Sequence, residues 1–110
     1  MDLSKLKNVR KLRLYVASAI AAAGSIKQHE LLSLAKKAGF ILDGQRGKEN
    51  VYVHSFESSA PTLSIPDHGR DPRKPLAKGI LQRIDEVLFN LEEKLSKQQE
   101  VHDELEDQSR

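Results

Sequence analysis

A chain of 110 residues, of which 38% are hydrophobic and 31% charged, has room for one domain with one core. It contains no cysteine, which excludes a disulfide framework and a thiolate zinc site, and its four scattered histidines form no metal-binding motif. No apolar run approaches the length that spans a bilayer. We therefore expect a cytoplasmic protein that binds no metal and no other cofactor.

The formal net charge of +2 is unevenly distributed. Residues 96–110 contain two basic and five acidic side chains, a net charge of −3, so residues 1–95 carry +5. A basic body with an acidic tail is compatible with a nucleic-acid surface and a separate solvating or partner-binding tail. Ordinary solvated charge explains the same distribution, so charge alone does not decide between them.

Two amphipathic helices are predicted before residue 40. In the first, apolar residues recur every three or four positions over residues 6–23, and Gly24 ends it. Basic residues before an apolar stretch also resemble a signal peptide, but they lie inside the helical pattern, which favours a mature helix. The second helix is expected to begin with a capping box of Ser25 and Gln28, to end at Gly39, and to pack its leucine and alanine face on a sheet.

From residue 39 to residue 69 the pattern changes to alternation bounded by Gly, Asn, Asp and Pro, which is typical of an antiparallel meander. Three strands are predicted, at residues 40–43, 51–56 and 62–65. A polar, basic turn that contains glycine, residues 44–50, separates the first two strands. The third strand ends at Pro66, which has no N–H to donate to a ladder.

A long helix is predicted after a basic connector at residues 68–75, with Pro75 in its first turn. Alternating steps of four and three define a heptad seam: Ala77, Leu81, Ile84, Leu88, Leu91, Leu95, Gln98, His102 and Leu105. The first half of the seam is expected to pack on the sheet. The second half extends past the core, so it pairs with another chain, folds against the first helix or frays. A homodimer through the helix from Leu81 to Leu105 is one predicted assembly.

Four short segments resemble the HicA toxin family in their order along residues 29–87, about half of the chain. They are the helix end Lys37-Ala38-Gly39-Phe40, the basic turn Arg46-Gly47-Lys48-Glu49-Asn50 before Val51-Tyr52, the strand end Ile65-Pro66-Asp67-His68-Gly69, and the helix start Lys78-Gly79-Ile80-Leu81. In the family these places hold a Lys-Ala-Gly-Phe-like corner, a Gly-Ser-His turn, a Pro-x-His-x strand end and a Lys-Gly-x-Leu-like segment.

The resemblance implies an α+β fold like that of double-stranded-RNA-binding domains, with the order α-β-β-β-α and the helices on one face of a three-stranded antiparallel sheet. Residues 1–95 then form a single domain that includes an additional N-terminal helix, residues 1–24. Residues 96–110 form an acidic tail that is helical or frayed. The resemblance also implies a toxin of a type II toxin–antitoxin system, an endoribonuclease that hydrolyses mRNA without a metal and is neutralised by a HicB-like antitoxin.

The chain departs from the family at the turn that carries the chemistry, where Lys48 stands for the serine and Glu49 for the histidine. Cleavage of RNA without a metal needs a base that titrates near neutral pH. A turn carboxylate such as Glu49 is weakly basic and repels phosphate. His54 on the second strand and His68 after the third are the other catalytic candidates. The three residues have structural alternatives as a solvated turn residue, an ordinary strand histidine and a turn-stabilising residue.

Cationic side chains on the turn and the connector are the candidate RNA contacts: Arg46, Lys48, Arg70, Arg73 and Lys74. Lys27, Lys36 and Lys37 extend this patch along the second helix. Each cation neutralises a phosphate, and A-form RNA is recognised by shape and 2′-hydroxyl groups. Three functions follow: a HicA-like toxin, a catalytically inactive RNA-binding or interaction module, and a coiled-coil adaptor.

Overall fold

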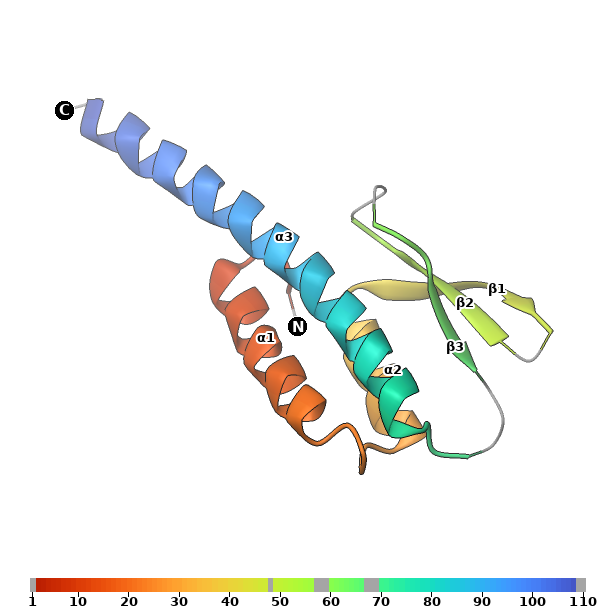
Figure 1. Ribbon diagram of the computed structural model, residues 1–110. Coiled ribbons are helices and arrows are strands. Elements are labelled where there is room, and N and C mark those ends of the chain that lie inside the picture. Colours follow the sequence, from red (N-terminus) through yellow and green to blue (C-terminus); the bar gives the residue numbers. More distant parts are fainter. Residues whose placement is uncertain (1, 48, 57–59, 67–69, 109–110) are drawn as a thin grey trace.

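Two helices precede a three-stranded antiparallel sheet, and a longer helix follows it (Figure 1). The computed structural model describes residues 2–47, 49–56, 60–66 and 70–108, with side chains described up to residue 98. The elements are α1 (Leu6–Ala21), α2 (Gln28–Lys37), β1 (Phe40–Arg46), β2 (Glu49–His54), β3 (Leu63–Pro66) and α3 (Lys74–Gln108). The predicted α+β class, with a meander between helices, is confirmed.

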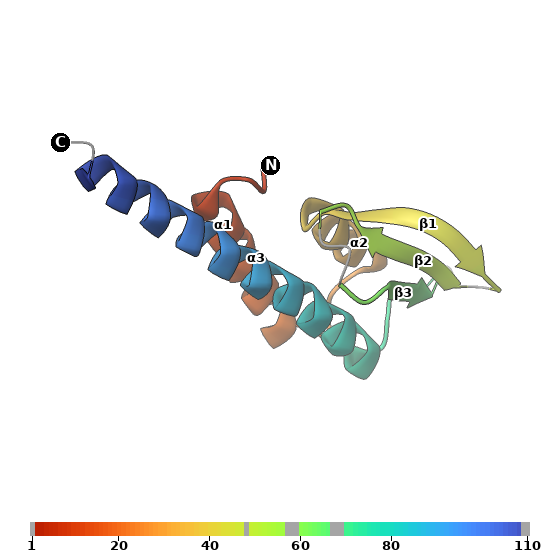
Figure 2. The ribbon, with the colours of Figure 1, turned by 90° about the horizontal axis from the view of Figure 1, so that it is seen from above.

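The sheet has the strand order β1-β2-β3, and β3 packs beside α3 (Figure 2). The β1–β2 hairpin is tighter than predicted, because Arg46 already pairs with Glu49 and only residues 47 and 48 separate the two strands. Gly47 has a φ of 61°, the left-handed conformation that a two-residue hairpin turn requires. The predicted seven-residue turn therefore becomes strand on both sides, with a register shift between Leu42 and Gly44.

One hydrophobic core joins the sheet to all three helices. Four sheet residues of the core cluster lie on one face: Phe40, Tyr52, Leu63 and Ile65. Tyr52 pairs with Leu63, and Ile65 is two residues further along β3, while Phe40 pairs with His54, two residues from Tyr52. The leucine and alanine face of α2 is buried against this face, as predicted, through Leu31, Ala35 and Ala38. Burial of these apolar side chains is the main force that holds the layers together.

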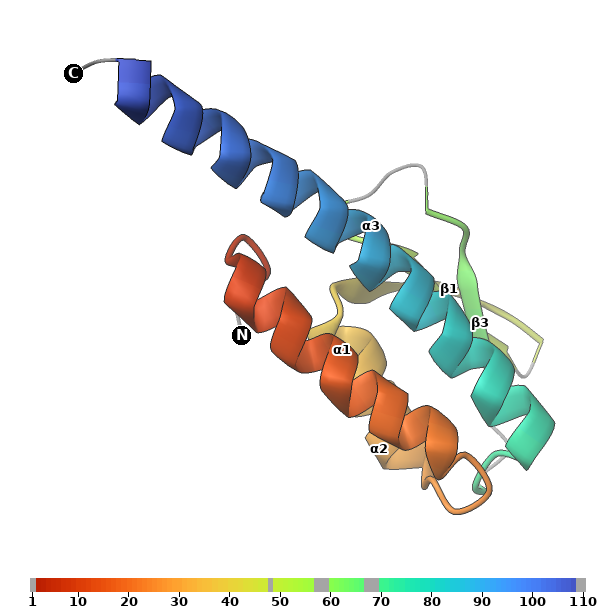
Figure 3. The ribbon, with the colours of Figure 1, turned by 60° about the vertical axis from the view of Figure 1, so that its left-hand side comes forward.

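The first half of the heptad seam is occupied within the chain. Leu81, Ile84 and Leu88 are fully buried, and α1 packs alongside α3 (Figure 3). A homodimer through the whole helix from Leu81 to Leu105 is therefore wrong for this half of the seam, since a second chain would have to displace α1. Beyond the body, Leu95 is half-buried and Gln98 exposed, and α3 continues as a rod that gives the chain its extents of 59 × 28 × 19 Å.

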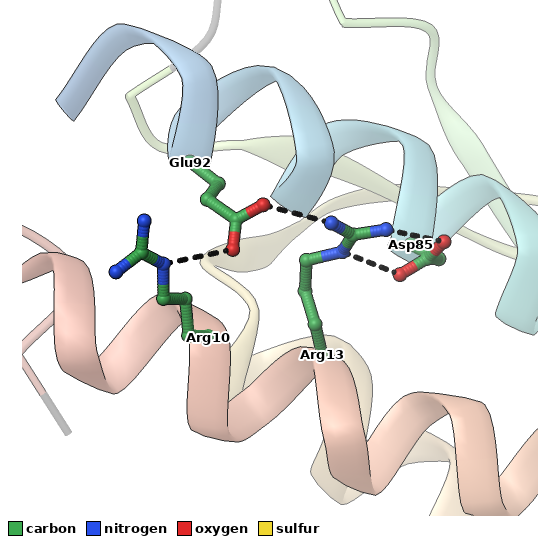
Figure 4. Close-up of polar contacts among 4 residues, drawn as sticks. All are labelled: Arg10, Arg13, Asp85 and Glu92. Carbon is green, nitrogen blue, oxygen red and sulfur yellow. Dashed lines mark hydrogen bonds and ion pairs between the residues drawn. The ribbon is translucent and has the colours of Figure 1, made fainter. Parts of the chain in front are cut away.

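Ion pairs fasten α1 to α3 (Figure 4). The Arg13 guanidinium donates to Asp85 through Nε at 3.0 Å and Nη2 at 3.3 Å, and to Glu92 through Nη1 at 2.9 Å. Arg10 reaches the second oxygen of Glu92 at 3.3 Å. The hydrogen bonds with Asp85 raise the pKa of Arg13 above its ordinary value. The guanidinium also lies over the Phe89 ring, 5.1 Å from its centroid.

The predicted capping box at the start of α2 is not formed. Ser25 Oγ donates to the carbonyl of Ala22, and Lys27 precedes the helix without a side-chain cap. The cap comes from across the fold, because the Asp71 carboxylate accepts the N–H of Gln28 at 3.0 Å. Gly39 ends the helix as predicted, with a φ of 98° and its N–H on the carbonyl of Lys36.

Candidate nucleic-acid interface

Two basic segments far apart in the sequence begin at the same end of the sheet. Arg46 pairs with Glu49 across β1 and β2, and Glu49 pairs with Pro66 across β2 and β3. The β1–β2 turn and the connector from β3 to α3 therefore start from the same end of the sheet (Figure 1). We call this region the basic end, and it is defined by Arg46, Arg70, Arg73 and Lys74.

Two hydrogen bonds from Gln28, the first residue of α2, hold the connector and the end of β3 to the body. The backbone N–H of Gln28 donates to Asp71, and the Gln28 side-chain amide donates to the carbonyl of Pro66 at 2.9 Å. The stem of Lys74 lies beside Gly24, whose missing Cβ would be 3.6 Å from Lys74 Cδ. These contacts fix the path of the chain between Arg70 and Lys74.

The side chains of all four cations of the basic end are exposed, and none of these side chains has a hydrogen bond or ion pair to another described residue. Two carboxylates lie nearby, and that of Asp71 already accepts a helix N–H. Glu49 is exposed at the start of β2. Cations that the fold does not use keep their full capacity to neutralise an anion from outside the chain.

The lysines of α2 do not form one patch. Lys27 is exposed directly before the residue that Asp71 caps, so it adjoins the basic end. Lys36 and Lys37 are in the last turn of the helix, about 15 Å further along its axis. They lie next to Phe40, where β1 begins, whereas Arg46 is at the other end of that strand. Only Lys27 therefore extends the basic end.

His54 is part of the core and not of the basic end. Its Nε2 lies 2.6 Å from the carbonyl of Ala38, and its Nδ1 accepts the N–H of Phe56 at 3.1 Å. A carbonyl only accepts, so Nε2 carries the proton and the ring is a neutral imidazole with both nitrogens engaged. The ring is also edge-on to Phe40 and Phe56, with centroids 5.1 and 5.6 Å away.

The His54 ring is closely packed against Gly39, which leaves no space for another group beside its Nε2. A Cβ on Gly39 would lie 2.7 Å from His54 Nε2, so glycine is required there by contact as well as by its positive φ. His54 pairs with Phe40, at the end of the hairpin opposite the pair of Arg46 and Glu49. We therefore do not retain His54 as a proton carrier for RNA cleavage.

Two predicted site residues, His68 and Lys48, lie outside the described residues. Glu49 is at the basic end, as the sequence placed it, and its side chain is exposed. Of the predicted catalytic groups, the structure thus describes one carboxylate at the surface and one buried imidazole.

Two of the surface grooves that the described residues form bear on function, and neither was predicted from the sequence. One, of about 610 Å³, lies between α1 and α2 and is lined by Tyr15, Ile26 and Leu34 among others. The other, of about 450 Å³, lies between β3 and the first turns of α3. The only sequence signal for the second groove was Gly79, a glycine inside a helical pattern with no local need for one.

Within the described part of the chain, no three His, Asp or Glu side chains come together as a metal site would need. No helix among the described residues is both long and apolar enough to cross a membrane. Comparison of the chain with protein-family models, with curated proteins and with solved structures gave no match. The resemblance to the HicA family therefore rests on residues of the chain alone.

Proposed function

We propose that this protein binds RNA through its basic end and acts as a HicA-like toxin that a HicB-like antitoxin neutralises. The observation that carries the proposal is that Arg46 and the segment of Arg70, Arg73 and Lys74 leave the sheet at the same end, with side chains that are exposed and have no partner among the described residues. These cations come from two segments more than twenty residues apart. A phosphate backbone that crosses both segments would meet a positive charge on each.

The arrangement of the elements supports the same proposal. From α2 to α3 the order is helix, three antiparallel strands, helix, and the core residues of the strands lie on one face. This is the layout that the HicA resemblance and a double-stranded-RNA-binding-like fold call for. Such a domain reads the shape and 2′-hydroxyl groups of RNA, so contacts from a strand turn and a connector are sufficient without base-specific side chains.

A second candidate function is an RNA-binding module without catalytic activity. Two observations favour it: both ring nitrogens of His54 are engaged in the core, and the surface residue at the family's histidine position is a carboxylate, Glu49. In the toxin hypothesis, His68 is then the remaining imidazole that would transfer the proton.

One experiment separates the two functions. The purified protein is incubated with a single-stranded mRNA in the presence of a chelator, and the same gene is expressed in cells while growth is followed. The toxin proposal predicts RNA fragments and growth arrest, and both are lost in the His68→Ala variant. Retention of intact RNA in a stable complex, with normal growth, identifies the inactive module. Absence of any complex at low salt contradicts both.

A further inference from the structure

The groove between β3 and α3 is an open sheet edge with a helix beside it. β3 is the last strand of the sheet, so its outer edge has no strand neighbour among the described residues. The first turns of α3 run along this edge, and the groove between them holds about 450 Å³. Leu63 and Ile80 are buried at its base, and Leu76 is 41% exposed on its rim. Native proteins normally protect such an edge, because it pairs readily with another strand.

Side chains already occupy backbone carbonyls at both ends of β3. At one end, Arg83 Nη1 donates to the carbonyl of Thr62 at 3.4 Å, and at the other, the Gln28 amide donates to the carbonyl of Pro66. Backbone groups two residues apart along a strand point to the same side, so the N–H and C=O of Ser64 face outward between them. Ser64 is where an added strand would pair.

Gly79 leaves space for a close approach from outside. It lies on the exposed side of α3, and no atom lies within 4 Å of the place where a Cβ would be. A glycine inside a helix lowers stability relative to alanine, and nothing within the described chain requires one here. A neighbouring backbone that packs against the helix at this point would require it.

The charges at the two ends of the groove are opposite. Glu49 lines the end where β3 finishes, since it pairs with Pro66, and Arg83 lines the end where β3 begins. A two-fold axis near Ser64 would place a second β3 antiparallel to the first. Each end of the groove would then face the opposite end of the partner's groove. Each Glu49 would meet the partner's Arg83, so the same favourable pair would form twice.

We propose that this groove is the seat of a second copy of the chain, with β3 paired antiparallel to the partner's β3 and the two α3 helices in contact at Gly79. The seam at residues 95–105 has no role in this dimer, which distinguishes it from a coiled coil through the C-terminal part of α3. The dimer does not depend on RNA, so the dimer and the proposed function can be confirmed or contradicted separately.

Sedimentation velocity of the full chain without RNA tests the proposal, with circular dichroism as a check of folding. We expect a dimer for the wild type and a monomer for Gly79→Gln, which fills the groove. Arg83→Glu and Glu49→Arg should each give a monomer, and the double variant Glu49→Arg/Arg83→Glu should restore the dimer. A restored dimer would show that the two residues meet across the interface. Two substitutions that each damaged folding would not restore the dimer when they are combined.

The tail provides the matched control. Leu105→Glu places a charge on the heptad seam and should leave the dimer intact. A dimer that is lost in Leu105→Glu would assign self-association to the tail and overturn the proposal. A monomeric wild type at the highest soluble concentration would overturn it too, as would single charge reversals that remain dimeric or a double variant that remains monomeric.

Discussion

The α1–α3 pair and the basic end use arginine in opposite ways. Arg13 lies between the two helices, with two carboxylates within 3.3 Å of its nitrogens and an aromatic ring beneath it. Arg46 and Arg70 are exposed and have no such partner among the described residues. The first kind of arginine contributes to the fold, and the charge of the second is not used within the described part of the chain.

This contrast shows why a count of charges does not locate a binding surface. The chain has 18 basic residues, yet the ones that matter for an external anion are those that the fold leaves unpaired at one place. The comparison therefore predicts that substitutions in the packed regions lower stability, whereas substitutions at the basic end lower RNA affinity and leave stability almost unchanged.

The largest loss of stability is expected at the Gly39 corner. Gly39→Ala forces an alanine into a φ of 98° and brings its Cβ to 2.7 Å from His54 Nε2, so the ring has to leave the carbonyl of Ala38. We expect the free energy of unfolding to fall by about 3 kcal/mol. Gly47→Ala is the matched control, because Gly47 has a φ of 61° but no atom near the added Cβ. It should lose about 1 kcal/mol. Equal losses in urea denaturation would show that the contact with His54 is unimportant.

A smaller loss is expected between α1 and α3. Arg13→Ala removes the bidentate bond to Asp85, the bond to Glu92 and the contact with the Phe89 ring. Its side chain is only 29% exposed, so the free energy of unfolding should fall by about 1 kcal/mol. Arg10→Ala removes one bond from a side chain that is 58% exposed and should change stability by about 0.3 kcal/mol. If Arg10→Ala proved the more damaging, the ion pairs would not be what fastens α1.

Elements with a strong period could be predicted from the sequence. The apolar spacing of α1, the leucine and alanine face of α2 and the alternation of β2 each follow from local geometry, and Gly39 marked the end of α2 correctly. The edges of the strands could not be placed, because only residues 47 and 48 separate them and the flanking polar residues pair as strand.

Contacts across long sequence separations were beyond a local pattern. Asp71 caps α2 from 43 residues away, so the nearer Ser25 was the natural but incorrect choice. The engagement of both His54 nitrogens depends on the carbonyl of Ala38, which no strand pattern reveals. At the candidate site, the antiparallel meander puts Arg46 and the start of the connector at the same end of the sheet. The prediction that Lys36 and Lys37 extend the same patch was wrong, because the length of α2 separates them from Lys27.

The salt dependence of RNA affinity tests the central claim most directly. The wild type is compared with the triple variant Arg46→Gln/Arg70→Gln/Arg73→Gln and with a control of equal charge, Lys7→Gln/Lys36→Gln/Lys37→Gln, whose lysines are exposed and lie away from the basic end. Fluorescence anisotropy of a labelled RNA gives log K against log salt. The basic-end variant should lose about 2 to 3 units of slope, since each phosphate contact contributes about 0.7 to 0.9, while the control keeps the wild-type slope. Equal slopes for the wild type and the basic-end variant, or an equal loss in the control, would contradict the account.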